Sequence, residues 1–414
     1  MSKKKYSRTN CRLCSSGDLR LVLQLESTPV GDAYIPAEKL NNKQELHPIK
    51  LYLCNSCGLL QIIDVVDPEL VYMDYIYHSS DSLGLVKHFE KYAESVINKI
   101  NLPEKSLVVE IGSNDGSLLK FFKERGLQVL GIDPAKKIAQ IANKSGVNTL
   151  ASFFDSKLAE KIVKEYGQAS IVIANNVLAN IDDLQDVIKG IRHLLKPDGV
   201  VVFETGYVSS LIENTIFDNI YHEHITYFSV KDLKNFFANN EMELIDIKLV
   251  PTKGGSLRGF VQLANGPRKV SDSVTKMIDK EEALGIQKAD TFALFSERLT
   301  KLKRELLSLL TNLKKKGKTI AGYGASVGVT TILYYFGLDS KIVDFLVDDN
   351  QSRHNLYSPG LHIPVLNPQN LYDKKPDYVI IFAWQYAEPI INKHKAYLEQ
   401  GGHFIKFLPK IEVI

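Results

Sequence analysis

Short apolar runs rich in β-branched residues alternate with helix-like stretches over much of this 414-residue chain. The run at residues 107–111 ends in a glycine-containing turn and is followed by a helix-like stretch, and the runs at 128–132 and 170–174 repeat the arrangement. This alternation is typical of parallel strands joined by helical crossovers. We therefore predict an α/β domain over residues 71–250, whose first part, 71–104, forms leading helices.

The pattern changes after residue 250. From about 271 to 316, Leu, Lys and Glu recur at helical spacing, which predicts one long amphipathic helix linking two domains. Beyond it, apolar runs at 319–323 and 379–383 again alternate with helix-like stretches. We expect a second α/β domain over residues 251–414.

Four cysteines stand in two pairs with metal-ligand spacing, Cys11-x-x-Cys14 and Cys54-x-x-Cys57. A gap of two residues lets both thiolates of a pair face one tetrahedral ion, and four thiolates leave no coordination position for substrate. We predict a structural Zn²⁺ in a small zinc-ribbon-like domain over residues 1–70. Redox chemistry or free thiols are less favoured, since neither pair has a thioredoxin-like context.

Composition and charge narrow the class of protein. Hydrophobic residues make up 44% and charged residues 24% of the chain, as in globular proteins, and the formal net charge is only +3. The basic clusters are short, so we expect no nucleic-acid partner. No apolar run is long enough to cross a bilayer, and the first residues are polar, so we expect no membrane association and a cytoplasmic location.

The turn after the 107–111 run has the spacing Glu-x-Gly-x-x-x-Gly. It differs from the Gly-x-Gly-x-x-Gly of dinucleotide sites and resembles the turn of S-adenosylmethionine-dependent methyltransferases. An acidic residue at the end of the next strand is suited to bind ribose hydroxyls. The candidate cofactor-binding residues are Glu110, Gly112, Asn114, Gly116, Ser117, Asp133, Pro134, Phe153, Asn175 and Asn176.

A dense group of proton-handling side chains lies between Tyr221 and Tyr227, where His222, Glu223 and His224 also stand. A histidine beside a carboxylate can act as a general base at neutral pH. The alternative is a polar surface turn, or a buried histidine that is satisfied by a backbone carbonyl. Side-chain inventory alone does not distinguish these.

Together these motifs resemble the sugar C-methyltransferases that act on nucleotide-linked 4-keto deoxysugars, and the resemblance covers nearly the whole chain. Its specific landmarks are the cysteine pairs, Tyr-Ile-Tyr-His-Ser-Ser at 75–80, the Glu110 turn, Ala-Asn-Asn-Val-Leu-Ala at 174–179, Tyr-x-Glu-His at 221–224, Gly-Gly-Ser-Leu-Arg at 254–258, Gly-Tyr-Gly-Ala-Ser at 322–326 and Tyr-Ser-Pro-Gly at 357–360. The resemblance implies a zinc-binding domain, a central Rossmann-like methyltransferase domain and a C-terminal Rossmann-like domain that binds a nucleotide sugar.

The family's chemistry suggests roles for individual residues. A ketone at C4 acidifies the C3 proton, and its removal gives an enolate that attacks the methyl group of S-adenosylmethionine. The resemblance makes His224 the base, Glu223 its orienting or sugar-binding partner and Tyr221 a sugar-binding or proton-relay group, with Tyr75 or Tyr77 polarising the ketone. The implied substrate-binding residues are His78, Ser79, Ser80, Arg258, Gly324, Ser326, Arg353 and Tyr357.

The implied substrate is dTDP- or another NDP-4-keto-6-deoxyhexose, and the implied assembly is a monomer or small homo-oligomer. The chain also departs from the family pattern. Val327-Gly328 replaces the Ala-Lys that usually follows Gly-Ala-Ser, Gln385 replaces an Asn, and Asn180 replaces a His. A cation expected near the substrate is therefore missing. Arg258, Arg353 and Lys253 are the candidates to replace it.

Two other classes of enzyme fit parts of the sequence. One is an RNA or protein methyltransferase with the zinc module as a recognition element, although the dispersed basic residues argue against it. The other is a nucleotide-sugar oxidoreductase with a nicotinamide site at residues 322–326 and Asp344 downstream, which leaves the Glu110 turn unexplained. A non-catalytic binding protein would have no use for the acid-base cluster.

Overall fold

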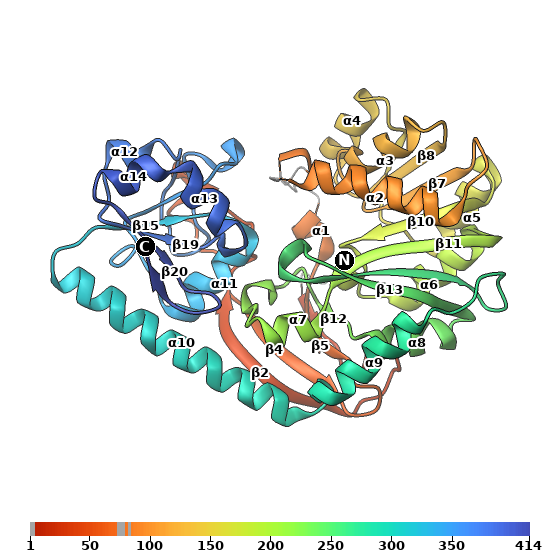
Figure 1. Cartoon of the computed structure of the whole chain (residues 1–414), viewed down its shortest axis with the longest axis horizontal. Coiled ribbons are helices and arrows are strands. Elements are labelled where there is room, and N and C mark those ends of the chain that lie inside the picture. The colour runs from red at the N-terminus through yellow and green to blue at the C-terminus, as the bar shows by residue number, and fades with distance from the viewer. Residues whose placement is uncertain (1–4, 73–78, 82–83) are drawn as a thin grey trace.

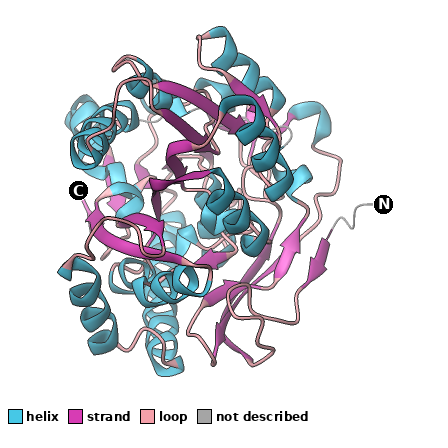
Figure 2. Ribbon diagram, turned by 90° about the vertical axis from the view of Figure 1, so that its right-hand side faces the viewer, coloured by secondary structure: helices cyan, strands magenta, loops and turns pink. Residues whose placement is uncertain are grey.

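The computed structural model describes residues 5–72, 79–81 and 84–414. It confirms the predicted α/β class with a small N-terminal unit and two larger α/β units. In Figure 1 the central unit lies on the right, the C-terminal unit on the left, and strands of the N-terminal unit run below both. Helices and strands are intermingled along the whole chain, as the turned view in Figure 2 shows.

A seven-stranded sheet forms the central unit, in the order β13-β14-β11-β10-β7-β8-β9. Its strands run in one direction except for β14, which is antiparallel to both of its neighbours, β11 and β13. The strands are β7 (Leu107–Ile111), β8 (Gln128–Asp133), β9 (Thr149–Ala151), β10 (Ala169–Asn175), β11 (Leu195–Gly206), β13 (Met242–Val250) and β14 (Ser256–Leu263).

Helices cover both faces of this sheet because its strands carry apolar side chains on both sides. Val108 belongs to a core with helices α2 and α3, whereas the next residue, Val109, faces the opposite core with α5, α6 and α8. This alternation follows from the two-residue repeat of a strand. The helices are α2 (Leu85–Ile100), α3 (Ser117–Lys123), α4 (Lys136–Lys144), α5 (Ser156–Tyr166), α6 (Leu184–Leu194) and α8 (Val230–Asn239).

The hairpin β13–β14 spans the expected domain boundary at residue 250. All of β14 lies beyond that residue, yet it pairs with β11 over six positions from Val201 to Gly206. We therefore propose that the central domain extends to Leu263.

The N-terminal unit contains a four-stranded antiparallel sheet, β12-β5-β4-β2. Its edge strand β12 comes from residues 226–227, more than 150 positions away in sequence. The central segment near His224 is thus part of the zinc-domain sheet. The strands of this unit are β1 (Lys5–Ser7), β2 (Leu19–Thr28), β3 (Ile35–Pro36), β4 (His47–Cys54), β5 (Leu60–Ile62), β6 (Asp64–Val66) and β12 (Thr226–Tyr227).

The C-terminal unit has a six-stranded sheet, β18-β16-β15-β19-β20-β21, which is parallel except for β21. A short strand, β17, leaves this unit and pairs with β3 of the N-terminal unit. The elements are β15 (Ile320–Tyr323), α11 (Val327–Phe336), β16 (Phe345–Val347), β17 (Leu356–Tyr357), β18 (Val365–Leu366), α12 (Asn370–Asp373), β19 (Tyr378–Ile381), α13 (Ala387–Lys393), α14 (Lys395–Glu399), β20 (His403–Lys406) and β21 (Glu412–Val413).

The prediction of one helix from about 271 to 316 is wrong, because two helices occupy this segment. Helix α9 (Asp272–Leu284) ends at Gly285, whose φ of 63° is left-handed, and α10 (Ala289–Lys315) begins four residues later. A glycine in the left-handed region closes a helix at low steric cost. The amphipathic repeat resumes after Gly285, so the hydrophobic pattern alone did not indicate that the helix is interrupted.

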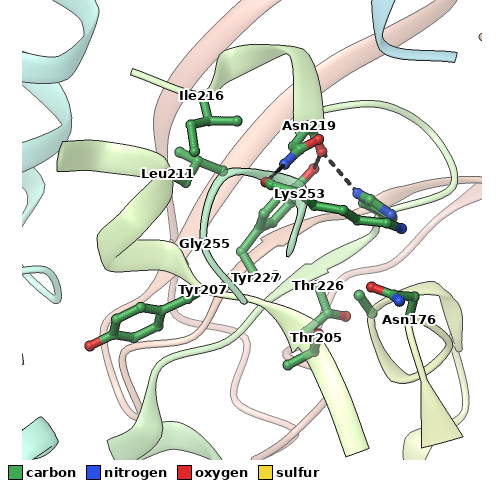
Figure 3. Close-up of a pocket in the computed structure, with 13 residues that line it drawn as sticks. Asn176, Thr205, Tyr207, Leu211, Ile216, Asn219, Thr226, Tyr227, Lys253 and Gly255 are labelled. Atoms are coloured by element: carbon green, nitrogen blue, oxygen red, sulfur yellow. Dashed lines mark hydrogen bonds between the residues drawn. The ribbon is translucent and has the colours of Figure 1, made fainter. Parts of the chain in front are cut away.

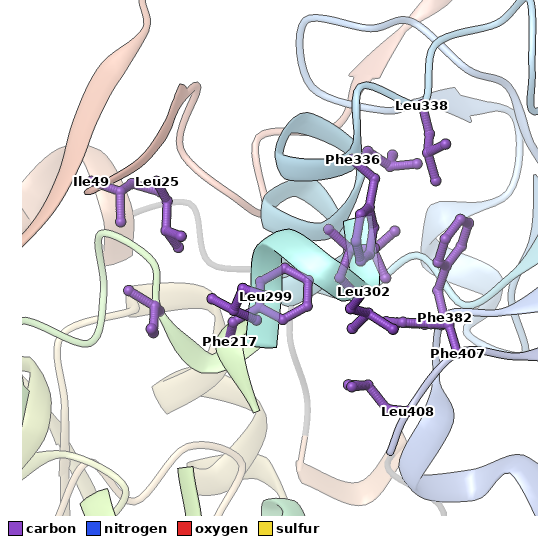
Figure 4. Packing of buried hydrophobic residues seen from close by; sticks show 14 of the residues in the cluster. Leu25, Ile49, Phe217, Leu299, Leu302, Phe336, Leu338, Phe382, Phe407 and Leu408 are labelled. Carbon is purple, nitrogen blue, oxygen red and sulfur yellow. The ribbon is translucent and has the colours of Figure 1, made fainter. Parts of the chain in front are cut away.

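One apolar core joins the three units. Leu25 of β2 and Ile49 of β4 belong to the same cluster as Phe217 of the central unit, Leu299 of α10 and Phe336 of α11. Figure 4 shows these side chains around α10. The units are therefore held together by buried apolar contact, which contributes roughly 25 cal/mol for each Å² removed from water. No helix in the described part of the chain has the length and apolar character to cross a membrane.

Candidate active site

A cavity of about 640 Å³ lies where strands β7 and β10 end. The chain proceeds outward from β7 through β8 and β9, and in the opposite direction from β10 through β11. Such a reversal leaves a crevice at the carboxyl ends of the strands, which is the usual ligand site of open α/β sheets. The volume falls within the range of about 300–1,000 Å³ that is typical of small-molecule sites.

The turn after β7 is fixed to β8 by its backbone amides. The Asn114 N–H donates to Asp133 Oδ2 and the Ala135 N–H donates to Asp133 Oδ1, both at 2.9 Å. Gly112 has a φ of 73°, and a Cβ there would lie 3.2 Å from Val177. The Asp133 carboxylate is thus held rigidly at the cavity wall, and each of its oxygens keeps a second lone pair for a ligand.

Glu110 and Asn175 present polar atoms that lack protein partners. Glu110 is 4% exposed and lines the cavity, and within the described residues its Oε2 has no hydrogen-bond partner, nor has Nδ2 of Asn175. Burial, reinforced by Asp115 and Asp133, raises the pKa of Glu110 well above its usual range. Buried polar atoms are normally satisfied, so this side of the cavity fits a ligand with its own donors and acceptors, such as S-adenosylmethionine.

Most of the predicted cofactor-binding residues line this cavity. They are Glu110, Gly112, Asn114, Asp133, Pro134, Phe153, Asn175 and Asn176. Gly116 and Ser117 do not, because Gly116 faces Val147 in the core and the Ser117 hydroxyl donates to Asp115 at 2.6 Å. Phe153 stands at the rim with 41% of its surface exposed.

The acid-base segment divides between the cavity and the core. Tyr221, Glu223 and His224 line the cavity. His222 is buried against the N-terminal sheet, where its Nε2 donates to the His47 carbonyl at 3.2 Å. Burial lowers the pKa of His222 to about 4, as expected for a neutral structural histidine. Tyr227 is buried and is not among the described residues that line the large cavity.

The hydrogen bonds of His224 fix its tautomer. Its Nδ1 faces the Asn219 carbonyl at 3.1 Å, and a carbonyl only accepts, so Nδ1 carries the proton. Nε2 is therefore unprotonated and accepts from the Tyr221 hydroxyl at 2.9 Å. Burial, together with the positive charge of Lys253, lowers the pKa of His224 to about 3. His224 is consequently a neutral imidazole with its basic nitrogen on the side of Tyr221.

A second cavity, of about 30 Å³, lies beside His224 and is shown in Figure 3. It is large enough for one or two water molecules. His224 and Lys253 border both cavities, as does Asn176. Thr205 and Thr226 also line the small cavity, and their hydroxyl groups have no partner within the described residues. Ordered water in this space would satisfy them.

The cavity wall also contains titratable residues that were not among the sequence-based candidates: Tyr72 of α1 (Pro68–Tyr72), His88 and Glu204. Lys253, which the sequence suggested only as a replacement cation, lines the cavity too. His88 Nε2 lies 3.0 Å from Glu204 Oε2. The sequence could have indicated Glu204 only by its position. Glu204 stands near the end of β11 and therefore at the same edge of the sheet as Glu110 and Asn175.

Arg258 lies behind the cavity wall. Its Nε donates to Glu204 Oε1 at 2.7 Å, and its guanidinium stacks on the Tyr92 ring at 4.1 Å from the ring centre. Although burial opposes it, the hydrogen bond from His88 and the charge of Arg258 hold the pKa of Glu204 below its usual value. Arg258 thus fixes a charged cavity residue and is not itself among the described lining residues.

The other predicted substrate-binding residues are dispersed. Ser79 lines the cavity and its N–H donates to Asn114 Oδ1 at 2.9 Å, whereas Ser80 is exposed. Tyr75, Tyr77 and His78 lie outside the described residues. Arg353 forms a buried ion pair with Asp32 at 2.7 Å, and Tyr357 pairs with Ile35 of β3.

Gly324 and Ser326 do not reach the cavity because the first turn of α11 is covered. A Cβ on Gly31 would lie 2.5 Å from Val327, and one on Gly328 would lie 2.6 Å from the Asp218 carbonyl. The C-terminal unit contributes Gln385 and Tyr386 instead, from the 3₁₀ turn η7 (Trp384–Tyr386). Trp384 holds this turn by donating to Asp218 Oδ2 at 2.9 Å.

The four cysteines converge as the spacing predicted. Cys11 Sγ lies 3.6 Å from Cys57 Sγ, Cys14 Sγ lies 3.6 Å from Cys54 Sγ, and all four sulfurs lie within 4.8 Å of one another. A tetrahedral zinc with Zn–S bonds of about 2.3 Å has sulfurs about 3.8 Å apart. The cluster fits a structural Zn²⁺ with four thiolate ligands.

Arg12, which lies between two of these cysteines, connects the zinc site to the residue after His224. It is 2% exposed, and its Nη1 donates to the side chain of Gln61 at 3.2 Å and to the Ile225 carbonyl at 3.3 Å. The Ile62 N–H donates to the same Ile225 carbonyl at 2.9 Å.

Comparisons with known proteins agree with these three units. Family models match residues 11–72 ("Putative zinc binding domain"), 85–247 ("Methyltransferase domain") and 251–409 ("C-methyltransferase C-terminal domain"). The C-methyltransferase NovU of Streptomyces niveus is 32% identical over 404 residues, which cover 98% of this chain and 96% of NovU. The chain belongs to the C-methyltransferase family. It is an S-adenosylmethionine-dependent C-methyltransferase with a zinc-binding domain, as the sequence predicted.

More distant relatives of this C-methyltransferase match a smaller part of the chain. The ubiquinone biosynthesis O-methyltransferase of Escherichia fergusonii is 28% identical over 102 residues, which cover 24% of this chain and 42% of that protein. Among solved structures, an S-adenosylmethionine-dependent methyltransferase from Clostridium acetobutylicum is 12% identical with a TM-score of 0.36, over 43% of this chain and 92% of that one.

We expect Cys54→Ser to lose the bound zinc and to lower the midpoint of thermal unfolding, because a site with three thiolates binds zinc less tightly and its metal contributes to folding. Metal analysis of the purified wild-type protein should give about one zinc per chain. Ser56→Ala is a matched control, since Ser56 is exposed and adjacent to a ligand. A metal-free protein with an unchanged unfolding midpoint would contradict the structural role.

Proposed function

We propose that this C-methyltransferase transfers the methyl group of S-adenosylmethionine to C3 of a nucleotide-linked 4-keto-deoxysugar, such as dTDP- or another NDP-4-keto-6-deoxyhexose. The observation that carries the proposal is the neutral His224 imidazole, which lines the same cavity as Glu110 and Asp133 and has its basic nitrogen on the Tyr221 hydroxyl. A base beside a methyl-donor site suits a carbon acid, and the proton next to a ketone is acidic enough for an imidazole to remove.

The proposed reaction starts at His224 Nε2. When the Tyr221 hydroxyl has turned from Nε2 to a sugar oxygen, the single Nε2 lone pair takes the C3 proton, the C–H electron pair forms the C3–C4 double bond, and the ketone π electrons move to the oxygen. The enolate carbon then attacks the sulfonium methyl group, whose electrophilic carbon is the cofactor's contribution, and the C–S electron pair stays on sulfur. The proton leaves His224 to solvent.

Tyr221 controls access to the base. In the resting site its hydroxyl donates to Nε2. Because Nε2 has one lone pair, the phenolic hydrogen must turn toward the sugar before Nε2 can take a proton, and the protonated nitrogen is then a donor. Glu223 lies at the same wall and raises the pKa of Tyr221, an effect second to that of burial. We propose that both side chains bind sugar hydroxyls.

On the opposite wall we propose that Asp133 accepts hydrogen bonds from the ribose hydroxyls and that Phe153 stacks on the adenine. Glu110 then faces a cationic or hydroxylated part of the cofactor. The distribution of charge supports this orientation, because the carboxylates Glu110, Asp115 and Asp133 cluster at the β7 turn and a cofactor with a net positive charge is attracted there.

The alternatives are less well supported. A nicotinamide site at Gly322–Ser326 would need the first turn of α11 to be open, and Gly31 and Asp218 occupy that position. Against an RNA substrate, the basic clusters of the sequence are short, and Lys99, Lys231, Lys314 and Lys318 each form a local ion pair. We also propose that the enzyme works in the cytoplasm, where thiolate ligands remain reduced.

Replacing His224 by Ala should abolish both hydrogen exchange at C3 and methyl transfer, because no other base takes its place. We expect both rates to fall about 10²- to 10⁴-fold. The measurement is deuterium uptake at C3 of a 4-keto-6-deoxy nucleotide sugar with S-adenosylhomocysteine present, and mass analysis of the methylated product. His193→Ala is the control, since His193 is exposed on α6. Wild-type exchange in His224→Ala would remove His224 from this role.

As the pH is lowered through 6.5, kcat/KM should show no decrease that is caused by protonation of His224. Its pKa is lowered to about 3, so the imidazole is neutral and competent throughout the range well above that value. His88 is the other imidazole in the described cavity wall, so His88→Asn is the control variant. An acid limb near 6.5 that persists in His88→Asn would show that His224 titrates in the ordinary range.

A further inference from the structure

Lys253 occupies an unusual backbone position in the turn between β13 and β14. It lies in the 3₁₀ turn η5 (Thr252–Gly254) with φ 52° and ψ 33°, in the left-handed region. A non-glycine residue there is strained by roughly 1 kcal/mol or more, and such strain is concentrated at functional sites. Side-chain amides hold the turn, because Asn219 Nδ2 donates to the Lys253 carbonyl at 3.2 Å and Asn214 Nδ2 to the Gly254 carbonyl at 3.3 Å.

This turn directs the Lys253 side chain into the active site. Lys253 lines both cavities, and Figure 3 shows it extended between Asn219 and Asn176, with Thr205 and Thr226 beneath it. Its charge acts on His224, whose pKa it lowers in addition to the effect of burial. The ammonium is therefore close to the proposed base and to the position of the reacting sugar carbon.

Lys253 is the cation of the site that has no fixed counter-ion. Within the described residues, no hydrogen bond or ion pair involves its Nζ. Glu223 and Glu204 attract it, and Glu204 is also bound by Arg258 at 2.7 Å and by His88 at 3.0 Å. Lys253 is an exposed residue of the turn, so its ammonium stays open to an anion that enters the large cavity.

We propose that Lys253 is a catalytic residue whose ammonium donates a hydrogen bond to the ketone oxygen of the substrate and stabilises the negative charge that develops there. This inference rests on the proposed function. When His224 takes the C3 proton, the electron pair of the C–H bond becomes the C3–C4 π bond and the C4–O π pair moves onto oxygen. The lysine proton stays on nitrogen. After methyl transfer the C4–O double bond re-forms and the hydrogen bond weakens.

The location favours the ketone oxygen over the sugar-linked pyrophosphate as the partner of Lys253. The lysine stands beside the imidazole, and on its far side is a space for only one or two water molecules. A pyrophosphate at this position would occupy the place of the reacting ring. An enolate between Lys253 and protonated His224 also separates two positive charges that otherwise repel each other.

The test compares Lys253→Met with the wild-type enzyme in C3 deuterium exchange and in methyl transfer. Methionine keeps much of the length and removes the donor. We expect exchange and kcat to fall about 10²- to 10³-fold, as for loss of one oxyanion donor, with the KM for the nucleotide sugar and the unfolding midpoint unchanged. Added methylamine should restore part of the rate in Lys253→Ala. Lys248→Met is the matched control, because Lys248 is an exposed residue of β13.

Each outcome has a distinct meaning. Wild-type exchange in Lys253→Met overturns the inference while the proposed function stands. A raised KM with kcat retained also overturns it and assigns the lysine to the pyrophosphate, and a lowered unfolding midpoint with no rescue by methylamine in Lys253→Ala makes the lysine structural. If the wild-type enzyme neither exchanges the C3 proton nor methylates any 4-keto sugar, the proposed function fails and the inference with it.

Discussion

The pairing of β12 with β5 determines where the proposed base lies. Two residues of β12, Thr226 and Tyr227, complete the zinc-domain sheet, and the backbone between them and His224 is held by bonds to Ile62 and Arg12. Arg12 stands inside the first cysteine pair, so one arginine joins the metal-binding turn to the active-site loop. The closed, thiolate-only zinc site is thus connected to the loop that carries the proposed base, and it has no open coordination position for substrate.

The rest of the cavity is also built from residues of different units. Its walls come from the central sheet, from α1 at the end of the zinc domain and from the η7 turn of the C-terminal unit. Rigid placement of groups from three units requires that the units do not move independently, and the shared apolar core around α10 supplies that rigidity. Catalytic geometry within fractions of an ångström depends on such support.

The sequence was informative where chemistry is local. Cysteine spacing, the Glu110 turn and the Tyr221–His224 segment each concern residues within a few positions of one another. The structure brings the cysteines to one cluster, and Glu110, Tyr221, Glu223 and His224 to the walls of one cavity. Prediction failed where long-range pairing decides. Arg258 was predicted to bind substrate, but antiparallel pairing of β14 with β11 places it opposite Glu204, which binds it. Likewise, the Gly322–Ser326 turn has the form of an anion site, yet residues almost 300 positions earlier cover its helix.

That covered helix bears on how new specificities arise. The C-terminal unit retains strand, glycine turn and helix, but its helix α11 packs on the N-terminal segment. Among the described residues, this unit lines the cavity only through the short loop that carries Gln385 and Tyr386. Exchange of this unit between homologous enzymes would disrupt a buried interface with two other units. Diversification toward other substrates is therefore easier through point changes in this loop than through recombination of modules, and engineers who seek altered sugar or nucleotide preference face the same restriction.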